Sequence, residues 1–370
     1  MIGNRKINEV TQMKTKIITL EQLEEERERW EEIADILRNG GLVAFPTETV
    51  YGLGADGLNC EAAAKIYAAK GRPSDNPLIL HISDFQEIER LAMDVSEDAN
   101  KVMNAFWPGP LTVILKKKEI VPYGTTGGLD TVAIRMPSHP VARKLIQISK
   151  VAIAAPSANT SGRPSPTKAE HVLQDLDGKI DIIIDGGEVG IGIESTIVDL
   201  TGDTPTILRP GYITKPMLED VIGKKVEIDP AILHKEGMDG LKPKAPGMKY
   251  KHYAPKGDLT IVEGKNIEDV IQAITVLVKE KMEQGFKVGV IAIEESIERY
   301  SDGIVKSIGS RLDEVSISSK LYGVLREFDD EEVDYIYSES FGQDDFGQAI
   351  MNRLLKAAGY DMIQVQGGDQ

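Results

Sequence analysis

The stretch Ala44–Gly57, AFPTETVYGLGADG, follows a glycine and the apolar run Leu-Val, and it carries two threonines, a glutamate, a tyrosine and three glycines. It lacks the spacing G-x-x-x-x-G-K-[ST] of a Walker loop, and no G-x-G-x-x-G pattern opens a helix here. Gly52 and Gly54 permit close backbone approach to a ligand, while Thr47 and Thr49 offer small hydroxyls. Taken alone, the stretch fits a ligand-binding loop and a polar strand cap equally well.

Helices alternate with short β-branched runs outward from this stretch, which predicts an α/β or α+β layered fold. An amphipathic helix is expected within residues 20–41 and a buried strand at 42–45. Further helices are expected at about 61–69, 141–148 and 169–176, and further strands at 77–83, 111–118, 131–137, 151–156, 181–187, 195–200 and 204–211. Each strand ends in a polar or Gly/Pro-rich turn, where open α/β sheets usually place their sites.

Periodicity fades after about residue 213, and the segment up to 256 is rich in Gly, Pro and Lys, as in an interdomain linker. A second, smaller α/β unit of Rossmann-like type then follows, with strands at 259–264, 287–293 and 333–340 and helices at 267–283 and 346–358. The pattern predicts four parts: a tail (1–20), a first domain (21–222), a linker or lid (223–256) and a C-terminal α/β domain (257–370).

The charge is unevenly distributed. Of the formal net charge of −16, residues 257–370 contribute −12, from 11 Lys and Arg against 23 Asp and Glu, whereas residues 1–256 contribute only −4. An anionic substrate is therefore plausible for the first two thirds of the chain. The N-terminus lacks an apolar signal core, and no apolar run is long enough for a membrane span, so a cytoplasmic protein without membrane contact is expected.

Cysteine and histidine patterns argue against a protein-built metal site. Cys60 is the sole cysteine, which excludes an internal disulfide and a cysteine-built zinc site. The histidines show no close metal-ligand spacing. His81 lies inside the apolar run LILHI, where a lone histidine is more often a satisfied core residue than a ligand.

A cationic turn, AAKGRPSDNPLILHI, places Lys70 and Arg72 two residues apart among prolines that restrain it. An ammonium and a planar guanidinium suit phosphate oxygens, and the alternative is a solvated basic turn. This turn, rather than the opening stretch, is the better candidate for binding phosphate.

Other strand ends carry polar groups that point to one shared cleft. Thr131 and Arg135 stand four apart on a strand and so should face the same side. The loop APSANTSGRPSPT offers donors for phosphate or ribose at Ser157, Asn159, Ser161 and Ser165. Ser157 has no evident triad partners, so binding is favoured over hydrolysis. The last two candidates are Ser195, at a glycine-to-strand junction, and Arg209, at a strand end.

Taken together and in order, FPTETVYGLG, KGRPSDNPLILHI, WPGPLT, AIRMPSHP, APSANTSGRPSPT, ESTIVDL and ILRPG closely resemble the YrdC-like domain of threonylcarbamoyl-AMP synthases. The resemblance spans about residues 21–222 and implies a YrdC-like twisted open sheet with flanking helices. The segment KAPGMKYKHYAP, followed by an α/β tail, is similar to the long form of this family.

The resemblance implies a nucleotidyltransferase. Such enzymes make L-threonylcarbamoyladenylate and pyrophosphate from L-threonine, bicarbonate or carbon dioxide, and ATP with magnesium. A separate complex then transfers the threonylcarbamoyl group to the adenosine next to the anticodon of tRNA. The resemblance assigns Thr49, His81, Arg135, Ala155 (through its backbone) and Ser195 to the threonine pocket, which reverses the interpretation of His81. It assigns ATP to Arg72, Asn76, Thr131, Ser157, Ser165, Arg209 and Tyr250, with Lys70 and Arg72 supplying the catalytic charge.

The linker is expected to fold over the nucleotide and to gate entry and release.

Two alternatives to the synthase function remain. One is a non-enzymatic RNA-binding module, although the negative charge and an aromatic content of 5% argue against a basic stripe with stacking aromatics. The other is carbamoyl transfer through carbamoyl-adenylate, as in hydrogenase-maturation proteins, but the chain lacks zinc-finger cysteines and an acylphosphatase-like segment. No stable nucleic-acid binding is expected of the acidic C-terminal domain.

Overall fold

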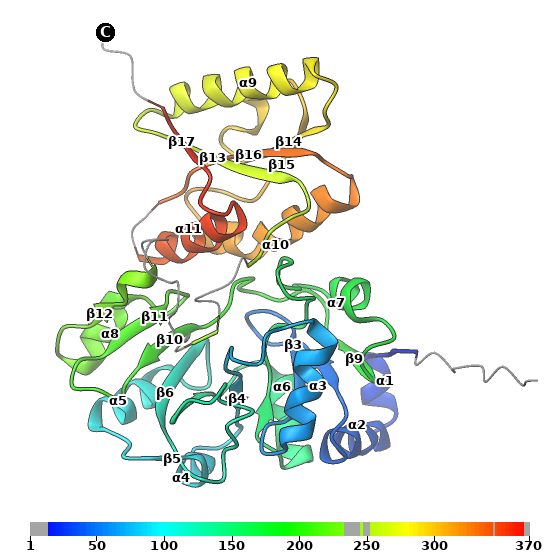
Figure 1. Cartoon of the computed structure of the whole chain (residues 1–370), viewed down its shortest axis with the longest axis vertical. Helices are drawn as coiled ribbons and strands as arrows, with labels where there is room; N and C mark the ends of the chain where they lie inside the picture. Colours follow the sequence, from blue (N-terminus) through cyan, green and yellow to red (C-terminus); the bar gives the residue numbers. More distant parts are fainter. Residues whose placement is uncertain (1–13, 233–244, 247–251, 343–344, 366–370) are drawn as a thin grey trace, which may run out of the picture.

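The computed structural model describes residues 14–232, 245–246, 252–342 and 345–365. It contains two α/β domains stacked end to end, each built on its own sheet (Figure 1). Residues 233–244 and 247–251, which include the predicted nucleotide contact Tyr250, lie outside the described residues.

The first domain contains twelve strands and eight helices among its described residues. Its strands are β1 (Lys16–Thr19), β2 (Val43–Phe45), β3 (Gly52–Asp56), β4 (Ile79–His81), β5 (Ala92–Met93), β6 (Leu111–Lys117), β7 (Thr131–Arg135), β8 (Ile153–Ala154), β9 (Ile182–Asp185), β10 (Thr196–Asp199), β11 (Thr206–Arg209) and β12 (Glu227–Ile228). Its helices are α1 (Leu20–Glu25), α2 (Glu28–Arg38), α3 (Cys60–Lys70), α4 (Gln86–Leu91), α5 (Glu97–Phe106), α6 (Pro140–Ser149), α7 (Ala169–Leu176) and α8 (Lys215–Ile222).

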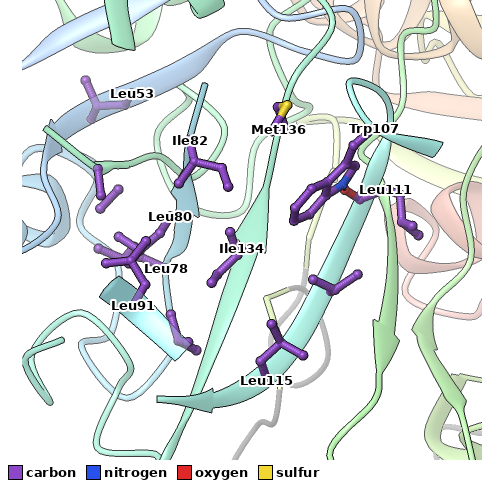
Figure 2. Close-up of a cluster of buried hydrophobic side chains, with 14 of the residues drawn as sticks. Leu53, Leu78, Leu80, Ile82, Leu91, Trp107, Leu111, Leu115, Ile134 and Met136 are labelled. Atoms are coloured by element: carbon purple, nitrogen blue, oxygen red, sulfur yellow. The ribbon is translucent and has the colours of Figure 1, made fainter. Parts of the chain in front are cut away.

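These strands form one mixed sheet in the order β1-β9-β2-β3-β8-β4-β7-β6-β10-β11-β12, with β5 pairing to β6. One face packs against α3, α4, α5, α7 and α8 through the main hydrophobic core. Figure 2 shows part of this core, where Leu80, Ile134 and Leu111 from three strands meet Trp107 and Leu91. The sequence prediction of an open sheet with flanking helices is therefore confirmed.

The two halves of the other face of the sheet are packed differently. Helices α2 and α6 cover the half around β9, β2 and β8. Over the second half, the described residues form a small apolar cluster, in which Ile79, Ile114 and Ala133 pack with Ala245 from the linker. This half-covered face is the floor of the functional cavity described below.

The opening stretch forms a tight antiparallel hairpin rather than a loop. Strand β2 pairs with β3 so that Val43 lies opposite Gly54 and Phe45 opposite Gly52. A Cβ at Gly54 would lie 2.7 Å from the side chains of both Phe45 and Ile153, so this close packing requires glycine. The polar Thr47–Val50 segment caps the hairpin.

The boundaries of the first domain differ from the predicted ones at both ends. Residues 16–19, assigned to the tail, form β1, which pairs in parallel with β9 and so belongs to the sheet. At the other end β12, within the predicted linker, pairs with β11. The expected single helix within 20–41 is two helices, α1 and α2, separated at residues 26–27. Short β-branched edge strands carry little periodicity, which explains why the sequence did not reveal them.

The C-terminal domain has a parallel five-stranded sheet in the order β15-β14-β16-β13-β17. Its elements are β13 (Asp258–Gly264), α9 (Ile267–Glu283), β14 (Val288–Ala292), β15 (Ile304–Ser307), α10 (Glu314–Asp330), β16 (Tyr335–Glu339), α11 (Asp345–Ala357) and β17 (Met362–Val365). Helix α9 covers the outer face, and α10 and α11 lie between this sheet and the first domain (Figure 1). The expected parallel sheet is present, but β15, α10 and β17 were not predicted.

Across the described residues no helix combines the length and apolar character needed to cross a membrane.

Candidate active site

A cavity that is partly open to solvent lies on the half-covered face of the first sheet, against the linker. Eight of the predicted site residues line it: Thr49, Arg72, His81, Arg135, Ala155, Ser157, Ser195 and Arg209. The other lining residues are Thr47, Val50, Gly52, Ile79, Pro156, Asn159, Glu194, Pro246, His252 and Tyr253. Segments far apart in the sequence thus meet in one place, as the repeated polar strand ends predicted.

Adjacent strand ends supply one wall of the cavity. His81 ends β4 and pairs in register with Arg135 at the end of β7. The Arg135 guanidinium donates through Nη1 to Thr49 Oγ1 at 3.0 Å, and its Nη2 lies 2.7 Å from Glu48 Oε1. Burial alone would raise the pKa of the Glu48 carboxyl, but the charge of Arg135 holds it below its ordinary value. A buried ion pair therefore fixes the guanidinium at the cavity wall.

The hydroxyl of Thr49 is fixed by a local turn. Thr47 Oγ1 accepts hydrogen bonds from the backbone N–H groups of Thr49 and Val50, at 3.1 and 3.2 Å, and donates to Val50 O at 2.6 Å. This threonine turn satisfies the backbone at the tip of the hairpin. Thr49 is thereby fully buried within reach of Arg135.

His81 is held in a neutral state. Its Nδ1 lies 3.1 Å from Ile79 O, and because a carbonyl only accepts, this nitrogen carries the proton. Burial, and then the nearby charge of Arg135, lower the pKa of the imidazole to about 3. His81 thus combines the core environment expected from its apolar neighbours with a position at the cavity.

Lys70 differs from the prediction that its ammonium faces phosphate. The side chain is almost fully buried at the end of α3, and its Nζ donates to the backbone carbonyls of Ser157 and Asn159. Lys70 is not among the described residues that line the cavity. Because a buried ammonium must have acceptors, it binds these two carbonyls and holds the loop that carries Ser157. Lys70 therefore supports the loop from behind the cavity wall.

Arg72 follows the left-handed Gly71 that ends α3 and does reach the cavity. Its Nη2 donates to Pro77 O at 3.0 Å, and burial lowers the pKa of its guanidinium to about 10, so the group stays charged. The neighbouring Asn76 is buried behind this turn, and its Oδ1 has no hydrogen-bond partner among the described residues. Asn76 itself does not line the cavity that the described residues form.

Ser195 and Arg209 form a further wall of the cavity. Ser195 Oγ shares a hydrogen bond of 2.7 Å with Thr112 Oγ1. Arg209, at the end of β11, donates through Nε to Ser195 O at 3.0 Å and through Nη2 to Ser195 Oγ at 3.2 Å. Burial lowers the pKa of Arg209 to about 10, which leaves a second permanent positive charge in the cavity.

Two other predicted ATP contacts lie behind or beyond the cavity. Ser165 is fully buried and donates to Glu194 Oε1 at 2.6 Å. Thr131 begins β7 and lines a separate surface hollow with Lys116, Tyr123 and Asp130. Thr131 shares the sheet face of Arg135, as predicted, but four extended residues place it roughly 13 Å along the strand. Its contact with nucleotide stays a prediction.

Glu194, which sequence reasoning did not single out, lines the cavity next to Ser195. Its carboxylate contacts two residues of the C-terminal domain, since Arg353 Nε donates to Oε2 at 2.9 Å and Tyr322 OH at 3.1 Å. Burial by itself would raise the pKa of this carboxyl, but Arg353 and Arg209, with the Ser165 hydrogen bond, lower it to about 2. No local signal in the motif ESTIVDL reveals these distant partners.

The linker reaches the cavity through Pro246, His252 and Tyr253. The Tyr253 ring stacks on Tyr322 of α10 at 5.1 Å between centroids, and Ala254 N donates to Gly162 O at 2.9 Å. Burial, followed by the charge of Arg72, lowers the pKa of His252 to about 3. The described part of the linker therefore lines the cavity, whereas the predicted nucleotide contact of Tyr250, which lies outside the described residues, stays a prediction.

Comparisons with known proteins match both domains of the chain. A family model described as "Telomere recombination" matches residues 35–211, and one described as "Threonylcarbamoyl-AMP synthase, C-terminal domain" matches residues 213–359. A Bacillus subtilis (strain 168) relative named threonylcarbamoyl-AMP synthase is 50% identical, covering 90% of this chain and 93% of its own. A relative of the same name from Pyrococcus abyssi (strain GE5 / Orsay) is 49% identical, covering 92% of this chain and 98% of its own.

The solved structures extend the likeness to three dimensions. The crystal structure of P. abyssi Sua5 complexed with L-threonine has a TM-score of 0.87 and 46% sequence identity, over 95% of this chain and 99% of that chain. At 95% coverage of this chain, the likeness includes both domains. The chain therefore belongs to the threonylcarbamoyl-AMP synthase family, in the form that carries a C-terminal domain.

Proposed function

We propose that this protein synthesises L-threonylcarbamoyladenylate and pyrophosphate from L-threonine, bicarbonate or carbon dioxide, and ATP. The observation that carries the proposal is the cavity itself. It joins a polar corner at Arg135, Thr49 and His81 to the two separate guanidinium groups of Arg72 and Arg209. Family membership supports the same assignment, and so does the likeness to P. abyssi Sua5, a protein whose crystal structure is complexed with L-threonine.

In the proposed complex Arg135 pairs with the threonine carboxylate, because a guanidinium binds a carboxylate through two parallel hydrogen bonds. Thr49, Ser195 and the backbone of Ala155 complete this end of the cavity. His81, being neutral, adds a polar edge without a second positive charge against the substrate amine. The neutral amine is the form that attacks carbon dioxide.

The reaction then needs alignment more than a protein nucleophile. The nitrogen of threonine bonds to the carbon of carbon dioxide and loses a proton, giving a carbamate. A carbamate oxygen attacks the α-phosphorus of ATP, and the bond to the bridging oxygen of pyrophosphate breaks. Arg72 and Arg209 neutralise charge on the phosphates, and Ser157 helps to hold the nucleotide.

Lys70 supports this step from outside the cavity. Its contacts with the carbonyls of Ser157 and Asn159 hold the loop whose hydroxyls and N–H groups face the ligand. In this proposal Lys70 positions the loop, and Arg72 carries the direct phosphate contact that was expected of both residues. Asn76, Ser165 and Thr131 remain proposed nucleotide contacts.

A magnesium ion would accompany the nucleotide, and such an ion is usually held by one or two carboxylates together with substrate phosphates. No group of three or more His, Cys, Asp or Glu side chains converges within the described ranges. The cavity carboxylate of Glu194 is already bound by Arg353. We therefore expect the ion to be held by the phosphates, and assign no step to it.

The product would serve tRNA threonylcarbamoyladenosine formation through a separate transfer complex. A carbamate is unstable in water, so covering the cavity with the linker protects it. The acidic C-terminal domain gives no reason to expect stable binding of nucleic acid by this chain, and a cytoplasmic site of action suits this role.

The experiment is an incubation of the full chain with ATP, magnesium, bicarbonate and labelled threonine. Pyrophosphate release and a labelled adenylate should both require threonine and bicarbonate. The control omits threonine, and an RNA-binding assay with unmodified tRNA runs in parallel. Pyrophosphate release without threonine dependence would refute the proposal, and tight tRNA binding without synthesis would favour the RNA-binding alternative.

A further inference from the structure

Two helices of the C-terminal domain place side chains directly behind the cavity. Arg353 lies on α11 with no exposed side-chain surface, and Tyr322 lies fully buried on α10. Both contact Glu194, whose carboxylate belongs to the first domain and lines the cavity. Figure 1 shows the same relationship between elements, with α10 and α11 facing the first domain.

The Arg353 guanidinium joins two backbone segments of the first domain. Besides its 2.9 Å contact from Nε to Glu194 Oε2, it donates through Nη2 to Glu194 O at 3.2 Å and through Nη1 to Pro210 O at 2.8 Å. Glu194 immediately precedes Ser195, and Pro210 immediately follows Arg209. One side chain of the C-terminal domain therefore fixes the spacing between the two residues that form this wall.

Arg353 also balances a charge that would oppose the substrate. Glu194 is buried beside Arg209, and its low pKa keeps the carboxylate ionised at neutral pH. Without Arg353, this carboxylate would keep its hydrogen bonds from Ser165 and Tyr322 but lose its ion-pair partner, and it would draw Arg209 away from an anionic ligand. An unpaired buried charge is costly, and a like charge beside phosphate weakens binding.

We infer that Arg353 is a positioning residue for nucleotide binding, through which the C-terminal domain completes the active site of the first domain. It holds the Ser195 and Arg209 segments together and neutralises Glu194, so that Arg209 remains available to phosphate. This inference rests on the proposed function for the identity of the nucleotide. It gives the C-terminal domain a role in binding ATP rather than tRNA.

The test uses the full chain and compares Arg353→Met, Arg353→Lys, Glu194→Gln and the double variant Arg353→Met/Glu194→Gln. Asp329→Asn is the matched control, because Asp329 pairs with Arg163 across the same domain interface without contacting Glu194. The readouts are kcat, KM for ATP and KM for threonine from pyrophosphate release, and ATP binding by calorimetry.

Arg353→Met should raise KM for ATP about 10- to 100-fold, as expected for the loss of one partner of a buried pair, while KM for threonine changes much less. Adding Glu194→Gln should restore most of the ATP affinity, because the glutamine is neutral and its carbonyl still accepts from Ser165 and Tyr322. Arg353→Lys keeps the charge but not the three contacts, so its KM for ATP should rise by a smaller factor. Asp329→Asn should leave both KM values unchanged.

An unchanged KM for ATP in Arg353→Met or Arg353→Lys would overturn the inference. A double variant as defective as Arg353→Met would also overturn it, because neutralising Glu194 would then not affect ATP binding. If Arg353→Met does not fold, the Arg353→Lys result decides. Failure of the proposed function can be told apart from failure of this inference. In that case the wild-type chain would show no threonine-dependent pyrophosphate release, whatever the ATP affinity of the variants.

Discussion

The guanidinium of Arg135 donates to the hydroxyl of Thr49 at 3.0 Å, which joins the end of β7 to the turn that follows β2. Both residues are largely buried where they line the cavity, and the arginine is paired on its other side with Glu48. The corner that they form is rigid before any substrate arrives. Rigid placement of polar groups is what a small polar substrate requires.

Replacing Thr49 with valine should impair threonine use more than ATP use. The substitution keeps the shape but removes the hydroxyl, at a cost of about 1 kcal/mol or roughly a fivefold rise in KM for threonine. Steady-state kinetics with each substrate varied would measure this difference. Thr125→Val is the control, because Thr125 is equally buried and its hydroxyl binds Gly57 O away from the cavity. A larger effect on ATP than on threonine would show that Thr49 has another role.

Lys70 and Arg72 should respond differently to loss of charge. Arg72→Gln should raise KM for ATP about 10- to 100-fold with little change in unfolding free energy, as expected for a charged contact to phosphate. Lys70→Met should instead lower the free energy of unfolding by about 1–3 kcal/mol, because two buried carbonyls lose their donor. Chemical denaturation and kinetics on both variants test this. A fully stable Lys70→Met protein with a pure ATP defect would mean that Lys70 contacts phosphate directly.

The linker should control retention of the product. Replacing residues 244–255 with a Gly/Ser segment of equal length removes Ala245, Pro246, His252 and Tyr253, which cover the sheet face or line the cavity. We expect faster loss of labelled adenylate from the enzyme in rapid gel filtration, and more hydrolysis of the carbamate. Tyr253→Ala, which removes the stacking on Tyr322, should show a weaker form of the same effect. Unchanged synthesis and retention would exclude the covering role.

Stability should fall as the pH is lowered through the ordinary range of histidine titration. The pKa of His81 is about 3 in the folded protein, so the unfolded chain takes up a proton below pH 6.5 while the folded chain does not. At pH 5 this difference costs about 2 kcal/mol of unfolding free energy relative to pH 8. His81→Gln should remove that part of the pH dependence, measured by denaturation at the two pH values. An identical pH dependence in the variant would mean that His81 is protonated in the folded state.

Much of the architecture could be predicted from local sequence. Alternating apolar residues located most strands of the first sheet, and α9 runs from Ile267 to Glu283 as its periodicity indicated. Helix α10 was missed because its sequence, EVSISSKLYGVLREFDD, mixes serines, a glycine and β-branched residues that are weak helix formers. Packing of its Leu321, Leu325 and Phe328 between the two domains stabilises it instead.

The sequence by itself determined which strand ends carry polar groups, and that Thr131 and Arg135 share a face, because side-chain alternation is a local property of a strand. Only the tertiary structure decided where the buried charges go. Lys70 binds carbonyls 87 and 89 residues away, and Glu194 binds Arg353 at a separation of 159 residues. A buried ion needs a partner, but packing within the first domain chooses the partner of Lys70 and packing between the two domains chooses that of Glu194. No local pattern around either residue encodes that choice.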